Sequence, residues 1–392
     1  MGRPSGAWWR GLAAVTTLGM FVVLVMGATV TNTGSAEGCG RSWPLCNGQF
    51  VPEFTVSTAI EYSHRAVTGV EAVLVVALTV GMLGRWRADR EVVVLAGLML
   101  GTLVLQAGLG AGAVLMPQSP FMLATHFGVS LIAFASTFLS TAVVFERTRG
   151  APQPDRGSLT DADISAEAIK RDATRRFRFW VIAVGAYVLG VVYLGAYVRH
   201  AGVSLACADW PLCNGQVVPS LDGPQAVVFG HRIAAVGALL LLGWLVRLAR
   251  AEGVGQRAAS ASVALVVLQA VSGAIVVWTR LGLFSTLAHA GIMALLFAAL
   301  ALLTRQVLTS AKRNDSVADL YPLSDGAAHG LQPSVDLESA RQHALATTSS
   351  GIPPARGRGA VADHRRGERP GGRRAGRGPS GNDGRSDGSG AS

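Results

Sequence analysis

Eight long apolar stretches constrain the fold of this chain more than any other feature of its sequence. Each could cross the hydrocarbon core of a bilayer, about 30 Å thick, as an α-helix. They lie near residues 12–31, 64–84, 92–114, 121–145, 179–198, 227–249, 259–279 and 283–304. Only 15% of the 392 residues are charged, whereas soluble domains carry about a quarter. We therefore expect an all-α integral membrane protein with eight transmembrane helices, which excludes a soluble enzyme and a disulfide-rich secreted scaffold.

Positively charged residues gather in alternate loops between these stretches. Arginine clusters precede the first and fifth stretches, separate the second from the third and the sixth from the seventh, and follow the eighth. Cytoplasmic loops carry such an excess. We therefore expect a multi-pass protein of a bacterial plasma membrane with both termini in the cytoplasm. The formal net charge of +10 then reflects this orientation and an arginine-rich tail, so the expected surroundings are the lipid bilayer and not nucleic acid.

An internal repeat divides the chain into two halves. The segment Trp-Pro-Leu-Cys-Asn-Gly-Gln occurs at residues 43–49 and again at 210–216. Further matches follow in the same order: His64-Arg65 with His231-Arg232, the Leu-Gln-Ala segments at 105–107 and 268–270, and His126 with His289. Each half holds four spans, an even number, so both halves have the same orientation. The sequence predicts two four-helix bundles as parallel repeats, related by a pseudo-two-fold axis along the membrane normal.

The polar segments complete the predicted domain organisation. Residues 1–145 form the N-terminal repeat and residues 179–308 the C-terminal repeat, and a charged cytoplasmic linker at 146–178 joins them. Residues 309–392 are rich in Gly, Ser, Pro and Arg. Such a composition cannot bury enough apolar surface to fold, so we expect a disordered cytoplasmic tail.

Four histidines lie near the start of an even-numbered span, at one depth near the outer surface. They are His64, His126, His231 and His289. Ionisable groups are costly inside a membrane and mark candidate functional sites, although a single histidine there more often only hydrogen-bonds across a bundle. Two pairs at matched depth instead predict bis-histidine haem ligation, with one haem in each four-helix half. Zinc is disfavoured because no carboxylate or thiolate stands beside each pair to complete a tetrahedral site.

Charged neighbours of these histidines distinguish the two halves. Arg65 and Arg232 each follow a histidine, and they could pair with haem propionates or extend to the membrane interface. Glu61 lies three residues before His64 and shares its helix face, but Val228 occupies the matching position in the second half. We infer that the first half carries out chemistry with Glu61 as a proton acceptor, while the second half carries electrons. In the alternative interpretation, Glu61 lies in the outer loop and only begins the helix.

The four cysteines lie two in each outer loop, Cys39 with Cys46 and Cys207 with Cys213. Disulfides persist outside the cytoplasm, and these short spacings are readily bridged. We expect one disulfide within each loop, acting either as a structural link or as a redox-active pair. Covalent attachment of a c-type haem is not expected, because the chain has no Cys-x-x-Cys-His segment.

Taken together, these residues resemble the haem A synthase family over about residues 10–305. The resemblance rests on Glu61-x-x-His64-Arg65, His126, His231-Arg232, His289 and the doubled Trp-Pro-Leu-Cys-Asn-Gly loops. The cysteine pairs match the bacterial type of that family. The long Arg/Gly-rich tail departs from its pattern.

The resemblance implies an oxidoreductase that converts the C8 methyl group of haem O to a formyl group, by way of an alcohol, with oxygen drawn from water. The product is haem A for cytochrome oxidase. In that family His64 and His126 would hold the substrate haem, and His231 and His289 a permanent haem b. The implied partners are haem O, haem O synthase and a membrane quinone, and association into a homo-oligomer is left open.

Two other functions share parts of this pattern. A di-haem b-type membrane cytochrome would need the same four histidines but would only transfer electrons, and Glu61 would be dispensable. A transporter could also use parallel repeats, but its helices would more often be broken and carry charges near mid-membrane. The haem extracted from the purified protein would distinguish these functions.

Overall fold

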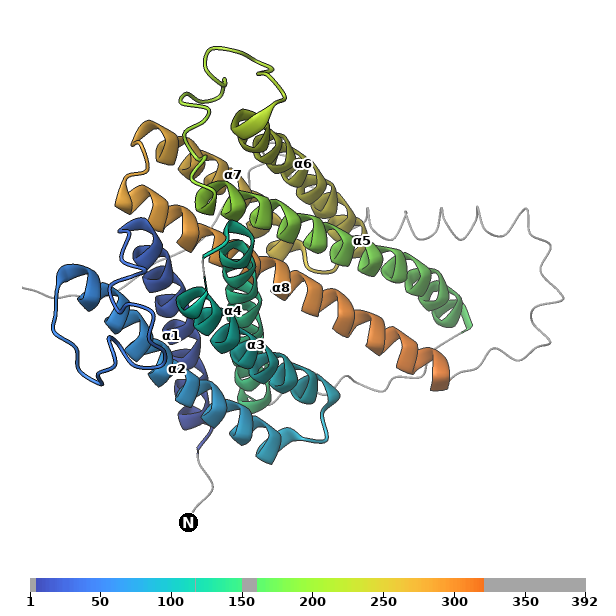
Figure 1. Ribbon diagram of the computed structural model, residues 1–392. Coiled ribbons are helices and arrows are strands. Elements are labelled where there is room, and N and C mark those ends of the chain that lie inside the picture. The colour runs from blue at the N-terminus through green and yellow to red at the C-terminus, as the bar shows by residue number, and fades with distance from the viewer. Residues whose placement is uncertain (1–4, 117, 150–160, 321–392) are drawn as a thin grey trace, which may run out of the picture. The chain divides into compact units, whose positions relative to one another are not determined.

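The computed structural model of the chain describes residues 5–116, 118–149 and 161–320. Within these ranges the chain folds into eight α-helices and no strands (Figure 1). They are α1 (Gly6–Asn32), α2 (Val56–Trp86), α3 (Arg90–Leu115), α4 (Pro120–Arg149), α5 (Asp161–His200), α6 (Gly223–Glu252), α7 (Gln256–Trp278) and α8 (Leu283–Leu320). All eight contain a stretch long and apolar enough to cross a membrane. The predicted all-α membrane protein with eight spans is therefore confirmed.

Several helices run beyond the predicted apolar stretches. Helix α5 begins at Asp161, inside the predicted linker, and α8 continues to Leu320, inside the predicted tail. Hydropathy marks only the part of a helix that lies in hydrocarbon, whereas backbone hydrogen bonding continues into polar residues with good helix propensity. The predicted tail beyond residue 320 lies outside the described residues, and the boundaries of linker and tail stay predictions.

The same pairs of helices are in contact in both halves. Helices α1 and α3 each contact both α2 and α4, and helices α5 and α7 each contact both α6 and α8. Between the halves, α8 contacts α1 and α4, and α4 contacts α5. In Figure 1 the first half runs from blue to teal and the second from green to orange. This pairing is what two equivalent bundles require, while the predicted pseudo-two-fold axis itself stays a prediction.

Apolar and polar contacts both join the halves. Leu24 of α1 and Phe134 of α4 belong to one buried cluster with side chains from α5, α6, α7 and α8. Arg199 of α5 donates to the Asn32 side chain at the end of α1, with Nε 2.9 Å from Oδ1. Far along the chain, Arg305 of α8 donates to Glu91 of α3, with Nε 2.6 Å from Oε1. The two halves are thus fixed against each other at several points.

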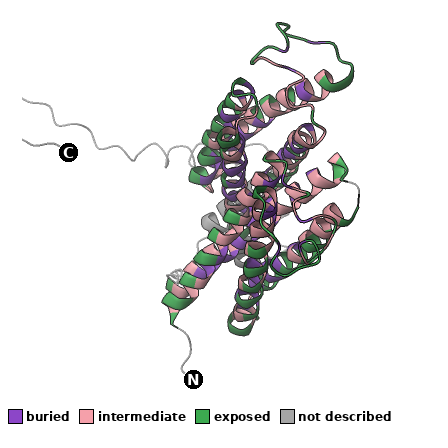
Figure 2. Ribbon diagram, turned by 60° about the vertical axis from the view of Figure 1, so that its left-hand side comes forward, coloured by how far each residue is buried: buried purple, intermediate pink, exposed green. Residues whose placement is uncertain are grey.

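Exposed residues lie along the outer faces of the helices (Figure 2), and many of them are large and apolar. On α2, for example, Val70, Val73 and Val80 are each more than 60% exposed. A soluble protein rarely exposes so much contiguous apolar surface. These faces suit contact with lipid, while the buried side chains lie where helices meet.

The even-numbered helices begin at matched points. Thr55 caps α2 by accepting a hydrogen bond from the Thr58 amide, and Pro224 stands in the first turn of α6, where its missing N–H costs nothing. His64 and His231 lie the same number of residues after the first residue of their helices. His126 and His289 likewise match each other in α4 and α8. The helix starts therefore place the histidines of both halves at equivalent positions.

Candidate functional site

In each half the two histidines stand on helices that are diagonal across the bundle. Helices α2 and α4 are both packed against α1 and α3, and α6 and α8 are both packed against α5 and α7. Side chains on diagonal helices can approach the bundle interior from opposite sides, which is how such bundles build ligand sites. The structure thus provides two sites of the same design, one with His64 and His126 and one with His231 and His289.

A glycine on a neighbouring helix lies against every one of the four imidazole rings. Gly27 faces His64, Gly110 faces His126, Gly195 faces His231 and Gly273 faces His289. A Cβ at these glycines would lie 3.2, 3.7, 2.6 and 3.3 Å, respectively, from Cε1 of the ring. Contacts under 3.4 Å are tight and 2.6 Å is impossible without movement. Gly27, Gly195 and Gly273 therefore create the space that their rings occupy, most strictly at Gly195, whereas a Cβ at Gly110 would make only ordinary van der Waals contact.

One ring nitrogen in each of three histidines lacks a partner in the described part of the chain. Nδ1 of His64, His126 and His231 is buried and has no hydrogen-bond partner among the described residues. His289 differs, because its Nε2 lies 2.9 Å from the Gln269 amide nitrogen and its Nδ1 2.8 Å from Oγ of Ser272. Buried polar atoms normally have partners. Imidazoles with free nitrogens on facing helices fit a haem iron, and His289 would have to release Gln269 before its Nε2 could bind one.

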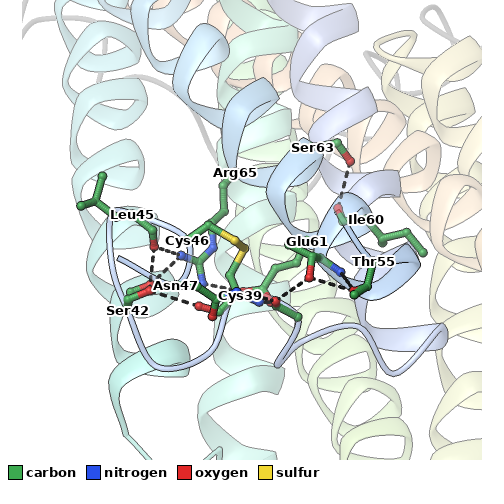
Figure 3. The surroundings of a disulfide bond; sticks show 12 residues. Cys39, Ser42, Leu45, Cys46, Asn47, Thr55, Ile60, Glu61, Ser63 and Arg65 are labelled. Atoms are coloured by element: carbon green, nitrogen blue, oxygen red, sulfur yellow. Dashed lines mark hydrogen bonds and ion pairs between the residues drawn. A yellow bond between two sulfur atoms is a disulfide. The ribbon is translucent and has the colours of Figure 1, made fainter. Parts of the chain in front are cut away.

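Glu61 connects the first site to the disulfide loop (Figure 3). Its side chain is only 4% exposed. It forms an ion pair with Arg65 one turn later in α2, and it accepts a hydrogen bond from the Cys39 amide, 2.8 Å from Oε2. Glu61 lies inside α2, and each of its carboxylate oxygens has a partner. This position differs from the alternative interpretation, in which Glu61 lies in the outer loop and only begins the helix.

Arg65 also binds the same loop from α2. Its Nη1 donates to the carbonyl oxygens of Ser42 and Leu45, at 2.7 and 2.9 Å (Figure 3). Five N–H donors in a planar fork let arginine bind several acceptors at once. Interaction with a haem propionate is not tested by these contacts and stays a prediction.

The second half repeats this arrangement without the carboxylate. Arg232 donates to the carbonyl oxygens of Leu212 and Asp209, at 2.7 and 2.9 Å. Its Nη2 also donates to the Cys207 carbonyl at 3.3 Å. In the first half Nη2 of Arg65 donates to the Glu61 carboxylate instead. Val228, at the position that matches Glu61, is 4% exposed. The two halves thus differ by a carboxylate, Glu61, and an apolar side chain, Val228, at positions that are equally buried.

Asp209 stabilises the second loop where the first loop has Ser42. Its carboxylate accepts hydrogen bonds from the amides of Asn214 and Gly215, the latter at 2.8 Å. In the first loop the Gly48 amide donates to the Ser42 hydroxyl instead, at 3.2 Å. The bond from the Gly215 amide is the main cause that holds the pKa of the Asp209 carboxyl below its ordinary value. The second loop therefore depends on a charge that the first loop does not use.

Both predicted disulfides are present, each within its own loop. The sulfur atoms are 2.00 Å apart in Cys39–Cys46 and 1.98 Å apart in Cys207–Cys213. All four cysteines are buried. The structure thus confirms the pairing, and the choice between a structural and a redox role is not decided by it.

Several residues of this site were missed by the sequence prediction. The four glycines belong to it, and so does Gln269; its repeat counterpart Gln106 donates to the His126 carbonyl, at 3.2 Å. The Leu-Gln-Ala repeat was the signal that could have identified the two glutamines. Glu71, a buried acid of α2, was also missed, although an acid within an apolar span is itself a signal.

Known proteins resemble this chain along most of its length. The model of the family described as cytochrome oxidase assembly protein matches residues 10–301. A haem A synthase of Geobacillus kaustophilus is 39% identical over 321 residues, which cover 79% of this chain and 95% of that protein. One of Bacillus licheniformis is 42% identical over 298 residues, 74% and 92% of the two chains. One of Symbiobacterium thermophilum is 38% identical over 290 residues, 72% and 90% of the two chains.

Proposed function

Since the chain belongs to the haem A synthase family of cytochrome oxidase assembly proteins, we propose that it makes haem A by oxidising the C8 methyl group of haem O. The observation that carries the proposal is the pair of equivalent diagonal histidine sites, each cradled by glycines. Two such sites suit an enzyme that holds a substrate haem beside a second haem. Relatives that are named haem A synthase support the same function.

The proposed reaction proceeds in two oxidations. In the first, the methyl group and a water molecule give the alcohol, two protons and two electrons. In the second, the alcohol gives the formyl group with the loss of two more protons and two more electrons. His231 and His289 would hold a resident haem b, which would supply a one-electron acceptor. A membrane quinone is the proposed final acceptor, and haem O synthase the proposed source of substrate.

Residues of the first half would position the substrate and move protons. His64 and His126 would hold the substrate haem from diagonal helices, and the apolar surroundings of the bundle would limit access of water. Glu61 would accept a proton released during the oxidation. Its present bonds to Arg65 and the Cys39 amide would then weaken, because a protonated carboxyl no longer forms an ion pair. Protonation of Glu61 would thereby weaken its contact with the disulfide loop.

The proposed orientation places this chemistry toward the outer face of a bacterial plasma membrane. Arginine is enriched in the loops on the side of both termini, and cytoplasmic loops carry such an excess. The disulfide loops would then lie outside the cytoplasm, where disulfides persist.

Haem analysis of two variants tests the proposal. The full chain is produced in a bacterial host that supplies haem O, and the haems are extracted from purified protein and from membranes. We expect haem A in the membranes and haem b in the protein. His231→Ala should remove the haem b, because only one of the two histidines that would hold it would remain. Haem b alone in the purified protein, with no haem A in the membranes, would instead favour a di-haem cytochrome that only transfers electrons.

Glu61→Gln separates chemistry from haem binding. We expect haem b to remain and haem A production to fall about 10²–10⁴-fold, the usual cost of losing a general base. Glu53→Gln is the matched control, since Glu53 is an exposed acid of the loop that precedes α2. Normal haem A production by the Glu61 variant would remove the carboxylate from the mechanism. Loss of haem b in that variant would show that Glu61 is structural and that the halves do not divide the work.

A further inference from the structure

A second buried carboxylate lies in the first half and has no partner. Glu71 of α2 is 3% exposed, and neither of its carboxylate oxygens has a hydrogen-bond partner among the described residues. It lies two helical turns after His64, so the two side chains share a face of α2. Both face α1, because Gly27 lies against the His64 ring and a Cβ at Gly19 would overlap the Glu71 carboxylate. Glu71 thus lies on the same side of α2 as His64, facing α1.

The matching place in the second half is arranged differently. Ala238 stands where the first half has Glu71, and Tyr187 of α5 stands where it has Gly19. The Tyr187 hydroxyl lies against Gly237 and donates to the Ala234 carbonyl, at 3.0 Å. The Tyr187 hydroxyl therefore has a hydrogen-bond partner within the protein. The Glu71 carboxylate has no such partner among the described residues, although Glu71 is 3% exposed and Ala238 is 2% exposed.

An unpaired buried carboxylate needs an external partner. Burial of a polar group without a hydrogen bond costs several kcal/mol, so a ligand group that bonds to it recovers a large free energy. Side chains of a helix point toward its N-terminus, which in α2 is the direction of His64. Two turns correspond to about 10 Å along the helix axis. A substituent on the edge of a porphyrin whose iron is bound by His64 can span that interval.

The proposed function supplies a substituent of the right chemistry. Haem O carries a hydroxyethylfarnesyl side chain, and haem b has a vinyl group in its place. The two molecules therefore differ by a hydroxyl group that can donate a hydrogen bond, joined to a long apolar tail. A carboxylate is found in the half proposed to bind haem O, and an alanine in the half proposed to bind haem b.

We propose that Glu71 is a specificity-determining residue that accepts a hydrogen bond from the hydroxyl group of haem O and so excludes haem b from the first half. The inference rests on the proposed function, since it assumes that His64 and His126 hold haem O. A site built to bond a substrate hydroxyl rejects an analogue without it far more strongly than an apolar site does. The selectivity therefore comes from the carboxylate that haem b would leave unpaired.

The test measures binding and not only turnover. Purified full-length protein that retains its resident haem is titrated separately with haem O and with haem b, and the dissociation constants are read from the absorbance change. The native chain should prefer haem O. Glu71→Ala should reduce that preference roughly ten- to hundredfold, as expected for loss of a hydrogen bond to a charged group. Glu71→Gln should retain most of it, because the amide oxygen still accepts a hydrogen bond.

A second pair of variants leaves the carboxylate in the chain. Gly19→Ala should lower the preference as Glu71→Ala does, since the new Cβ would displace the carboxylate. Gly11→Ala, on the same helix, is the matched control because its Cβ would meet nothing within 4 Å. If Glu71→Ala destabilises the protein, Gly19→Ala and Glu71→Gln still decide the outcome.

Two failures can be told apart. If the native chain produces haem A but Glu71→Ala and Gly19→Ala keep the native preference, the role of Glu71 is wrong and the proposed function stands. An equal affinity of the native chain for haem O and haem b, together with normal haem A production, would also overturn the role of Glu71. If the native chain neither produces haem A nor binds haem O, the proposed function itself fails.

Discussion

Replacing Gly195 with alanine should remove the haem of the second half. A Cβ at this position would lie 2.6 Å from Cε1 and 3.1 Å from Nε2 of His231, whereas non-bonded carbon atoms keep about 3.5–4 Å apart. The ring would have to retreat by about 1 Å, and overpacking of this kind costs about 1–3 kcal/mol. Because 1.4 kcal/mol is a factor of ten, the affinity for haem should fall roughly five- to 150-fold.

The assay is the amount of haem b per mole of purified protein, followed by titration of haem b into any protein that has lost it. Gly190→Ala, on the same helix, is the matched control because a Cβ there meets nothing within 4 Å. Thermal unfolding of both variants shows whether the fold is intact. A folded Gly195→Ala protein with full haem content and native affinity would refute the view that this glycine positions His231 as an iron ligand.

Three further outcomes are expected. Without reductant, a maleimide should label none of the four cysteines in the folded protein, and labelling of any one would contradict the disulfides. Because the pKa of Asp209 is lowered in the folded protein, its ionised carboxylate stabilises the loop above about pH 4. Protection of the Gly215 amide from hydrogen exchange should therefore fall as the pH drops through that pKa. The loop that contains Ser42 should show no such pH dependence. Truncation before Pro333 should leave the haem spectrum unchanged, and loss of haem from the stable truncated protein would show that the tail contributes.

Much of the fold could be predicted because a membrane restricts the choice of structure. Backbone groups in hydrocarbon must be satisfied within each helix, so eight apolar stretches predict eight helices. Alignment of the two halves by the internal repeat then identified four of the eight histidines as matched pairs. The disulfides followed because each loop holds one pair of cysteines close in sequence, and the structure confirms both. Helix ends were less accurate, since α5 and α8 continue into polar residues.

The contacts between helices could not be predicted in the same way. Glycine is common in apolar helices, and nothing local shows that Gly195 faces an imidazole ring while Gly190 faces open space. Arg65 offers a similar lesson. Its position after a histidine predicted a haem propionate or the membrane interface, and that prediction stays untested. The contacts of Arg65 with carbonyl groups of the disulfide loop were not predicted. These partners depend on how the loop folds back over the helix, which the pattern of residues does not record.

Two of the differences between the halves are carboxylates of α2. Histidines, glycine cradles, arginines and disulfide loops recur in both halves, whereas Glu61 and Glu71 are replaced by Val228 and Ala238. All four positions are at most 4% exposed, so the second half shows that apolar residues can fill such places. A carboxylate inside a membrane is costly; the ion pair with Arg65 offsets that cost at Glu61, and nothing in the described chain offsets it at Glu71. The first half therefore retains two polar groups that packing does not require, and a polar, reacting substrate is the simplest reason for both.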